Sequence, residues 1–225
     1  MIKSIIISVF LFSNILFADG LNKKYYDIKH IPKMKQVFFS FINKMAKIEN
    51  SYILEDRKYI KNYYNKNTAK MKAIRKRYGI KANSRLKDYL YIVDVIPNSM
   101  VLAQAAVESA WGKSRFFKDA KNVFGQWTWS GHGLIPKSRK KGSKHKIKIF
   151  QSYQKSLRTY LININKSWAY KKVRDLRAAQ RAKNQRLSGS YLSAGLEKYS
   201  QKKQEYVTII KKVIRHNNLS AYDIY

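Results

Sequence analysis

The chain has 225 residues, enough for one or two small domains with a genuine hydrophobic core. It contains no cysteine, which excludes disulfides, thiolate metal sites and a lipoprotein attachment site. Lysine and arginine number 47 against 13 acidic residues, giving a formal net charge of +34. Such a charge speeds association with polyanions and makes that association sensitive to salt.

The first eighteen residues have the pattern of a secretory signal peptide. Lys3 gives a basic start, residues 5–12 are strongly apolar, and Ala18 is a small residue suited to cleavage. Asn14 interrupts the apolar run, which is shorter than the roughly 20 residues of a stable membrane span. We therefore predict export to the periplasm or cell surface, with no stable membrane span after leader removal. An uncleaved anchor is the alternative.

The charge and the predicted export together restrict the partners. A basic chain suggests nucleic acid, but export argues against a specific nucleic-acid partner. Anionic wall or envelope polymers offer phosphates and carboxylates in the predicted compartment, so we expect contacts with them. Part of the charge also fits a general compositional bias towards lysine, isoleucine, asparagine and tyrosine.

Residues 19–85 are predicted to form a helical N-terminal extension. Apolar residues between Met34 and Ile48 recur at spacings of three and four, which predicts an amphipathic helix. A second helix is predicted from about residue 51 to residue 77, and Gly79 ends it. This extension shows no acid–base residue set. We expect it to pack against the following domain, and a wall-binding module is the alternative.

Residues 86–225 are predicted to form one mostly α-helical (α+β) domain. Strand-like residues at 122–129 and 146–150 flank a Gly- and Lys-rich tip, which predicts a β-hairpin. A short helix near Tyr89 and a longer apolar helix precede it. Four further helices are predicted near residues 153–164, 166–184, 189–198 and 202–216.

Glu108 lies in the longer apolar helix, which follows Pro97 and is predicted to be capped by Asn98 or Ser99 and to end at Gly112. A helix this apolar is buried, and burial raises the pKa of a carboxyl group. The negative end of the helix dipole acts in the same direction. A carboxyl kept neutral near neutral pH can serve as a general acid. The alternative is a buried glutamate satisfied by a structural partner.

The sequence around this glutamate carries specific motifs. Residues 103–112 read A-Q-A-A-V-E-S-A-W-G, and residues 122–127 read N-V-F-G-Q-W. This pattern closely resembles the glucosaminidase domains of bacterial wall hydrolases. With Gly133–Pro136 added, it resembles the Bax branch of glycoside hydrolase family seventy-three. The resemblance extends to residues 217–219 and covers most of residues 90–225.

The resemblance implies a lysozyme-like helical domain with a small β-hairpin lobe across a cleft. It implies a peptidoglycan N-acetylglucosaminidase that cleaves the β-1,4 bond between N-acetylglucosamine and N-acetylmuramic acid in glycan strands. Glu108 would be the general acid, and neither a metal nor an organic cofactor is implied.

Several polar and aromatic residues are candidates for sugar binding. Proteins bind sugars through amide donors and acceptors beside flat apolar side chains. We therefore predict substrate contacts by Asn122, Gln126, Trp127 and Tyr153. Trp129 is a further aromatic candidate. Core packing is the alternative for each aromatic residue, and we assign Trp111 to the core.

The resemblance also suggests roles for two tyrosines in the C-terminal part of the chain. Tyr199 matches a tyrosine that lines the cleft opposite the glutamate, so a direct catalytic role is predicted for it. Tyr206 is a weaker substrate-binding candidate because it also fits a packed helix face. His132 and His145 lie near the basic hairpin tip without a carboxylate or cysteine beside them, so we expect solvated histidines and no metal site.

A second carboxylate is missing where the resemblance places it. No Asp or Glu occurs between Ala120 and Arg174, and Lys146 follows His145 where the Bax branch usually has an acidic residue. Two-carboxylate glycosidases need the groups about 5 to 9.5 Å apart. The remaining acidic candidates are Asp94, Asp119, Asp175, Glu197, Glu205 and Asp223. Asp119, the nearest in sequence, is expected to cap or pair locally.

A mechanism with one carboxylate therefore fits better. The 2-acetamido oxygen of the substrate, positioned by Tyr199, would stabilise the anomeric carbon, or water would attack directly with inversion. Three competing functions remain open: a lytic transglycosylase, a catalytically degenerate wall-binding protein and a polyanion-binding protein.

Overall fold

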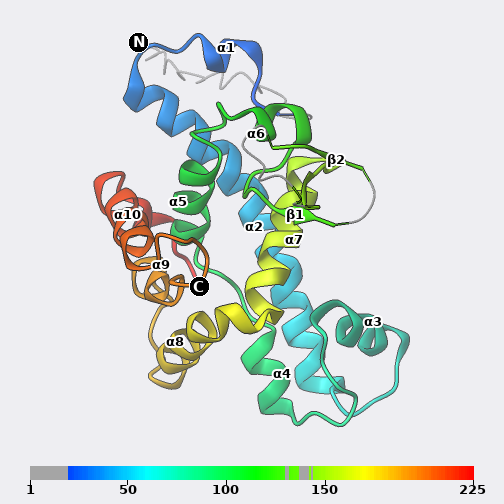
Figure 1. The fold of residues 1–225 in the computed structure, drawn as a ribbon. Helices are drawn as coiled ribbons and strands as arrows, with labels where there is room; N and C mark the ends of the chain where they lie inside the picture. Colours follow the sequence, from blue (N-terminus) through cyan, green and yellow to red (C-terminus); the bar gives the residue numbers. More distant parts are fainter. Residues whose placement is uncertain (1–19, 130–131, 137–141, 143) are drawn as a thin grey trace, which may run out of the picture.

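The computed structural model describes residues 20–129, 132–136, 142 and 144–225 (Figure 1). The predicted leader and part of the predicted hairpin tip lie outside these residues. The described chain is mostly helical with one small antiparallel sheet, which confirms the predicted fold class. Within the described residues, no helix combines the length and apolar character that a membrane span requires.

The N-terminal part is helical, as predicted, but its helix boundaries differ. Its elements are α1 (Lys23–Tyr26), α2 (Ile31–Tyr63), α3 (Ala69–Tyr78) and α4 (Leu86–Ile92). The predicted break between two helices near residue 50 was wrong, because α2 continues through it. No Gly or Pro interrupts α2 there, and the Asn50 amide is satisfied by the Ile96 carbonyl at 2.8 Å and Asn98 Oδ1 at 2.9 Å. The actual break precedes Thr68, whose side chain caps α3.

The remaining chain forms a bundle of short helices with a sheet. Its elements are α5 (Asn98–Glu108), α6 (Arg115–Ala120), β1 (Trp127–Thr128), β2 (Gly133–Leu134), β3 (Lys146–Lys148), α7 (Tyr153–Lys166), η1 (Trp168–Tyr170), α8 (Lys171–Ala182), α9 (Gly189–Leu192), η2 (Ser193–Gly195), α10 (Gln204–His216) and η3 (Leu219–Tyr222). The four predicted C-terminal helices are present; α7 is two residues longer than predicted, the other three are shorter, and two of these are joined to 3₁₀ turns.

Helix α5 lies at the centre of the fold. It packs against α2, α9, α10 and η3, and Figure 1 shows it between α2 and α10. Residues 98–106 are all buried, as the apolar sequence predicted. The sheet lobe and α7 lie on one side of this helix, and α9 and α10 lie on the other.

The cap of α5 comes from the far end of the chain. Asn98 and Ser99 lie inside the helix, so the predicted local cap was wrong. Asp223 takes this role, since its carboxylate accepts bonds from the Ser99 N–H at 2.8 Å and the Ser99 hydroxyl at 2.7 Å. It also accepts from the Gly189 N–H at 3.0 Å. A carboxylate at a helix N-terminus satisfies free N–H groups and interacts favourably with the dipole.

The end of α5 is an unusually tight turn. Ala110, Trp111 and Gly112 all have positive φ values, of 48°, 58° and 73°. The helix therefore ends at Glu108, four residues before the predicted stop. The Ser109 hydroxyl accepts from the Gly112 N–H at 2.8 Å, and the Tyr25 hydroxyl donates to the Trp111 carbonyl at 2.6 Å. The N-terminal extension thus holds the turn that follows Glu108.

The small sheet differs from the predicted two-stranded hairpin. Its strand order is β1-β3-β2, with Trp127 opposite Ile147 and Leu134 also opposite Ile147. The strands are shorter than predicted, and β2 was not predicted at all. Ile147, the central position, is buried against the rest of the fold.

Candidate active site

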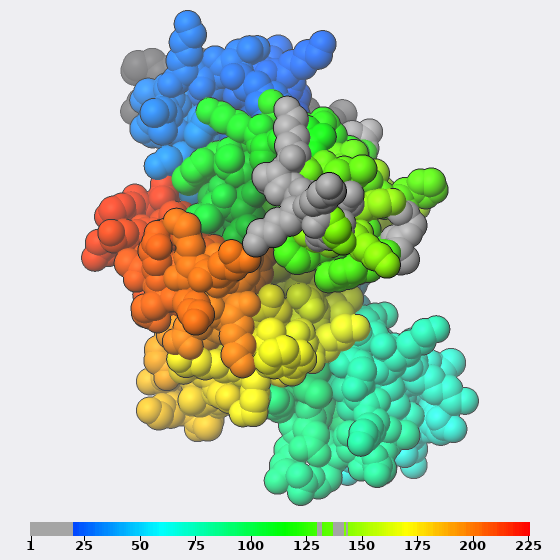
Figure 2. Space-filling view, in the orientation of Figure 1, coloured from blue at the N-terminus to red at the C-terminus, as the bar shows by residue number. Residues whose placement is uncertain are grey.

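Glu108 is the last residue of α5 and lines a cleft of about 680 Å³. The other lining residues include Phe124, Gly125, Gln126, Trp127, Trp129, Lys148, Thr159, Tyr160, Ile162, Asn163, Lys166, Tyr170 and Tyr199. They come from residues 124–129 around β1, from β3, from α7 and η1, and from the segment before α10. Figure 2 shows the surface hollowed where these segments meet.

The environment of Glu108 favours its neutral form. Burial raises the pKa of the Glu108 carboxyl above its ordinary value, and a hydrogen bond from Tyr206 opposes part of this rise. Among the described residues, Glu108 forms no ion pair. The direction of this shift agrees with the sequence argument.

A chain of hydrogen bonds from buried side chains holds the Glu108 carboxyl group. The Tyr206 hydroxyl donates to Glu108 Oε1 at 2.7 Å. The Gln104 amide donates to the Tyr206 oxygen at 3.0 Å, and the Tyr160 hydroxyl donates to the Gln104 oxygen at 2.5 Å. Tyr206, Gln104 and Tyr160 are all buried, so the network fixes one orientation of Glu108.

Stacked tyrosines form the wall opposite the sheet. The rings of Tyr199 and Tyr206 are nearly parallel, with 5.4 Å between centroids. The ring of Tyr170 lies 5.9 Å from that of Tyr199. The Tyr199 hydroxyl donates to the Phe124 carbonyl at 3.3 Å, and the side chain lines the cleft. Tyr199 therefore lines the cleft, whereas Tyr206 does not line it and is bonded to Glu108 instead.

A glycine turn passes directly over the carboxyl group. Gly125 has φ +64°, and a Cβ there would lie 4.0 Å from Glu108 Oε2. Phe124 stacks on Tyr160 with 3.8 Å between ring centroids, which fixes the turn against α7. The Gln126 side chain lines the cleft and lies 3.0 Å from the Ser156 hydroxyl. The N-x-F-G motif thus places backbone next to the acid.

Asn122 has a different place from the predicted one. It is buried, and its amide nitrogen donates to the carbonyls of Gln126 and Lys148, both at 2.9 Å. Its oxygen accepts from the Gln126 N–H at 2.9 Å. Because these bonds occupy the amide, Asn122 supports the turn and the sheet, and it does not reach the cleft.

Tyr153 is also placed away from the cleft. It is buried at the start of α7 and packs against Phe41 and Phe117, with ring centroids 5.5 and 4.5 Å away. The predicted sugar contact is corrected to a packing role. Trp111, assigned to the core, packs partly buried against Phe38 and Phe39.

Two tryptophans extend from the sheet into the cleft. Trp127 and Trp129 both line it, with 52% and 72% of their surface exposed. Trp127 stacks on His145 with 4.2 Å between ring centroids, so the expectation that His145 is simply solvated was wrong. His132 is exposed. Exposed indole faces beside a cleft are suited to stacking on sugar rings.

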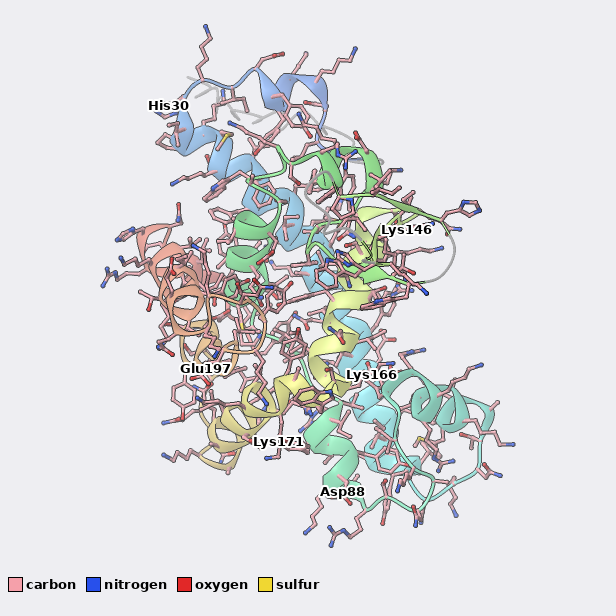
Figure 3. The ribbon with its side chains drawn as sticks, in the orientation of Figure 1. His30, Asp88, Lys146, Lys166, Lys171 and Glu197 are labelled. Carbon is pink, nitrogen blue, oxygen red and sulfur yellow. The ribbon has the colours of Figure 1, made fainter. Side chains whose placement is uncertain are left out.

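The other acidic candidates are engaged elsewhere. Asp94 is buried and bonded to Arg181, and Asp175 pairs with Lys171. Glu197 pairs with Lys172 at 2.7 Å, on the α9 and α10 side of the molecule (Figure 3).

Glu205 pairs with Lys202, and Asp223 caps α5. Asp119 is exposed and forms no ion pair within the described part of the chain, so its predicted local pairing was wrong. Glu108 is therefore the only carboxylate among the described residues that line the cleft. The described residues also contain no group of three His, Asp or Glu side chains that could hold a metal.

Sequence reasoning missed part of the network. Gln104 lies four residues before Glu108, and residues four apart share a helix face, so its amide in an apolar helix could have been linked to the acid. Tyr160 and Tyr170 had no local signal of this kind, because their proximity to Glu108 depends on the tertiary fold.

Comparison with known proteins identifies the class. The chain belongs to the Glucosaminidase family, described as mannosyl-glycoprotein endo-beta-N-acetylglucosaminidase, whose profile matches residues 84–219. The chain is therefore a glycosidase-type protein, and the family resemblance seen in the sequence is confirmed.

A curated relative is Protein bax of Escherichia coli (strain K12), which is 34% identical over 143 residues. The match covers 61% of this chain and 51% of the relative, so the chain spans about half the length of that protein. No solved structure gave a significant match.

Proposed function

We propose that this chain is an exported peptidoglycan hydrolase. It cleaves the β-1,4 bond between N-acetylglucosamine and N-acetylmuramic acid, and Glu108 is the general acid. The observation that carries the proposal is a single half-buried carboxyl with a raised pKa, lining an aromatic cleft in a chain of the Glucosaminidase family.

The first step breaks the glycosidic bond. Glu108 donates its proton to the leaving oxygen as the bond from that oxygen to the anomeric carbon breaks. The anomeric carbon belongs to N-acetylglucosamine, and the 2-acetamido carbonyl oxygen of this sugar bonds to it and forms an oxazolinium ion. This route suits a cleft whose described lining offers no second carboxylate.

The second step adds water. Glu108, now a carboxylate, takes a proton from a water molecule whose oxygen attacks the anomeric carbon. The bond to the acetamido oxygen breaks, and the carboxylic acid is regenerated. Tyr199 positions the acetamide from the wall of the cleft, while Gln126, Trp127 and Trp129 hold the neighbouring sugars.

Digestion of purified sacculi tests the proposed bond. Mass spectrometry should find products with a reducing N-acetylglucosamine end. Products with a 1,6-anhydro-N-acetylmuramic acid end would instead indicate a lytic transglycosylase. Binding without release would indicate a degenerate wall-binding protein.

The stereochemistry of the product tests the mechanism. The oxazolinium route predicts that the fresh product retains the β configuration, and that a thiazoline analogue of N-acetylglucosamine inhibits. Proton NMR of the first product, before mutarotation, checks this prediction. An α anomer there would rule out the acetamide route and favour direct attack by water.

A further inference from the structure

A second hollow borders α7 on a face next to the one that lines the cleft. It has a volume of about 390 Å³ and lies between α2, α3 and α7. Its polar lining is Glu49, Tyr52, Glu55, Asp56, Arg77, Tyr78 and Arg158. We call it the arginine pocket. Nothing in the proposed reaction uses it.

The two arginines of this pocket are held in place by buried acids. Glu49 is 3% exposed and accepts from Arg158 Nε at 2.7 Å and Nη2 at 3.0 Å. Asp56 is 6% exposed and pairs with Arg77. The arginine side chains themselves are 47% and 41% exposed. Each guanidinium is therefore fixed by an ion pair with a buried acid, while part of the arginine side chain stays exposed and lines the pocket.

Anchored guanidinium groups of this kind are suited to carboxylate recognition. Glu49 already occupies the Nε and Nη2 donors of Arg158, so its Nη1 group is the one placed to meet a further carboxylate. Little side-chain freedom is lost on binding, because the guanidinium is already fixed. The Arg158 guanidinium also lies 5.4 Å from the ring centre of Tyr52, which restricts it further.

The pocket also offers a site for a cation. Three of the 13 acidic residues of the chain line it, which gives its five charged side chains a formal charge of −1. Glu49 and Asp56 are paired with arginines, whereas Glu55 is exposed and forms no ion pair within the described part of the chain. Donors for a carboxylate and an acceptor for an ammonium group thus lie in one hollow.

The arginine pocket is close to the cleft. Ile162 of α7 lines both hollows, so α7 forms the ridge between them. A helix with its side chains is about 10–12 Å across. Four extended residues reach at most about 14 Å. A short peptide attached to a sugar in the cleft can therefore cross the ridge.

We propose that the arginine pocket binds the stem peptide carried by the glycan strand, through the peptide's free carboxylate and free ammonium group. This inference rests on the proposed function, since it places the sugar chain in the cleft. It makes the N-terminal extension part of substrate recognition, because α2 and α3 supply most of the charged lining.

The test compares two substrates that differ only in the peptide. One is glycan strands with stem peptides, and the other is the same strands after an amidase has removed the peptides. Initial rates of reducing-end release give kcat/KM for wild type, Arg77→Gln and Glu55→Lys. Matched controls are Arg85→Gln and Asp88→Lys, which alter an exposed ion pair at the start of α4. Figure 3 shows Asp88 at the end of the molecule away from the cleft.

We expect both pocket variants to lower kcat/KM on peptide-bearing strands by about tenfold, as loss of a charged hydrogen bond does. Rates on stripped strands and rates of the control variants should stay within about twofold of wild type. Equal losses on both substrates, or no loss on either, would overturn the proposal.

Two further measurements test the pocket even if a variant misfolds or the proposed reaction is wrong. If Arg77→Gln does not fold, the double variant Asp56→Asn/Arg77→Gln removes both charges and leaves no buried ion unpaired. Calorimetric titration with a tetrapeptide that has a free carboxylate and one free amine needs no catalysis. If wild type binds the tetrapeptide and Glu55→Lys does not, the proposed pocket is supported even if wild type cleaves no glycan. If wild type does not bind the tetrapeptide, the proposal is contradicted.

Discussion

Glu108 is the residue on which the proposed reaction depends. Replacement by Gln keeps its shape but removes the acidic proton, and general acid catalysis is worth a factor of about 100 to 10,000. We expect Glu108→Gln to lose wall hydrolysis by about that factor, with folding and sacculus binding retained. Reducing-end assays and circular dichroism check this. Activity within about threefold of wild type would remove Glu108 from the mechanism.

Tyr206 sets how far the pKa of Glu108 rises. Its hydroxyl stabilises the ionised carboxylate, so it lowers a pKa that burial raises. In Tyr206→Phe the pKa should rise further. Since a general acid must be protonated, the alkaline limb of the kcat/KM profile should move to higher pH.

The pH–rate profile of Tyr206→Phe measures this shift directly. Tyr191→Phe is a matched control, because Tyr191 is exposed and does not line the cleft. An alkaline limb that stays in place or moves to lower pH would show that the hydrogen bond does not govern the acid.

The pKa of Glu108 also affects stability. The folded state binds its proton more tightly than the unfolded state, so wild type loses stability as pH rises from the unfolded pKa through the folded pKa. Glu108→Gln has no such proton. Its Tm advantage over wild type should therefore grow with pH across this window and then level off. Thermal unfolding at a series of pH values checks this, and an advantage that shrinks with rising pH would contradict it.

At the scale of elements, the buried Asn122 connects the turn to the sheet. Asn122→Ala removes the bonds to the Gln126 N–H and to the carbonyls of Gln126 and Lys148, of which the Gln126 carbonyl keeps the Lys148 N–H; the loss costs about 1–3 kcal/mol. For a chain of this size, each 1 kcal/mol lowers Tm by about 2–4 °C. Calorimetry should find this loss, whereas Asn62→Ala, on an exposed face of α2, should change stability by less than about 0.5 kcal/mol.

Local sequence patterns predicted the elements whose causes are local. The apolar run around Glu108 predicted a buried helix, and Gly79 predicted the end of α3. The cap of α5 was not predictable from neighbouring residues, because Asp223 lies 124 residues away. The roles of Asn122 and Tyr153 were mistaken for the same reason: their partners, Lys148 and Phe41, are distant in sequence.

At the scale of the whole molecule, charge should govern attachment to the wall. Removal of the predicted leader, whose only charged residue is Lys3, would leave a net charge of about +33. Binding of the inactive Glu108→Gln variant to sacculi should fall steeply between about 0.05 and 0.5 M salt. Pull-down of the variant with sacculi measures the bound fraction. A fraction independent of salt would favour sugar contacts as the main anchor.

The distant cap of α5 has a consequence for the order of events during synthesis. Chains emerge from the ribosome N-terminus first, and long-range contacts form late. The first turn of α5 therefore lacks its carboxylate partner until Asp223 has emerged, and Tyr206 reaches Glu108 only shortly before. A nascent chain stalled before Tyr206 would carry Glu108 without the hydroxyl that donates to it.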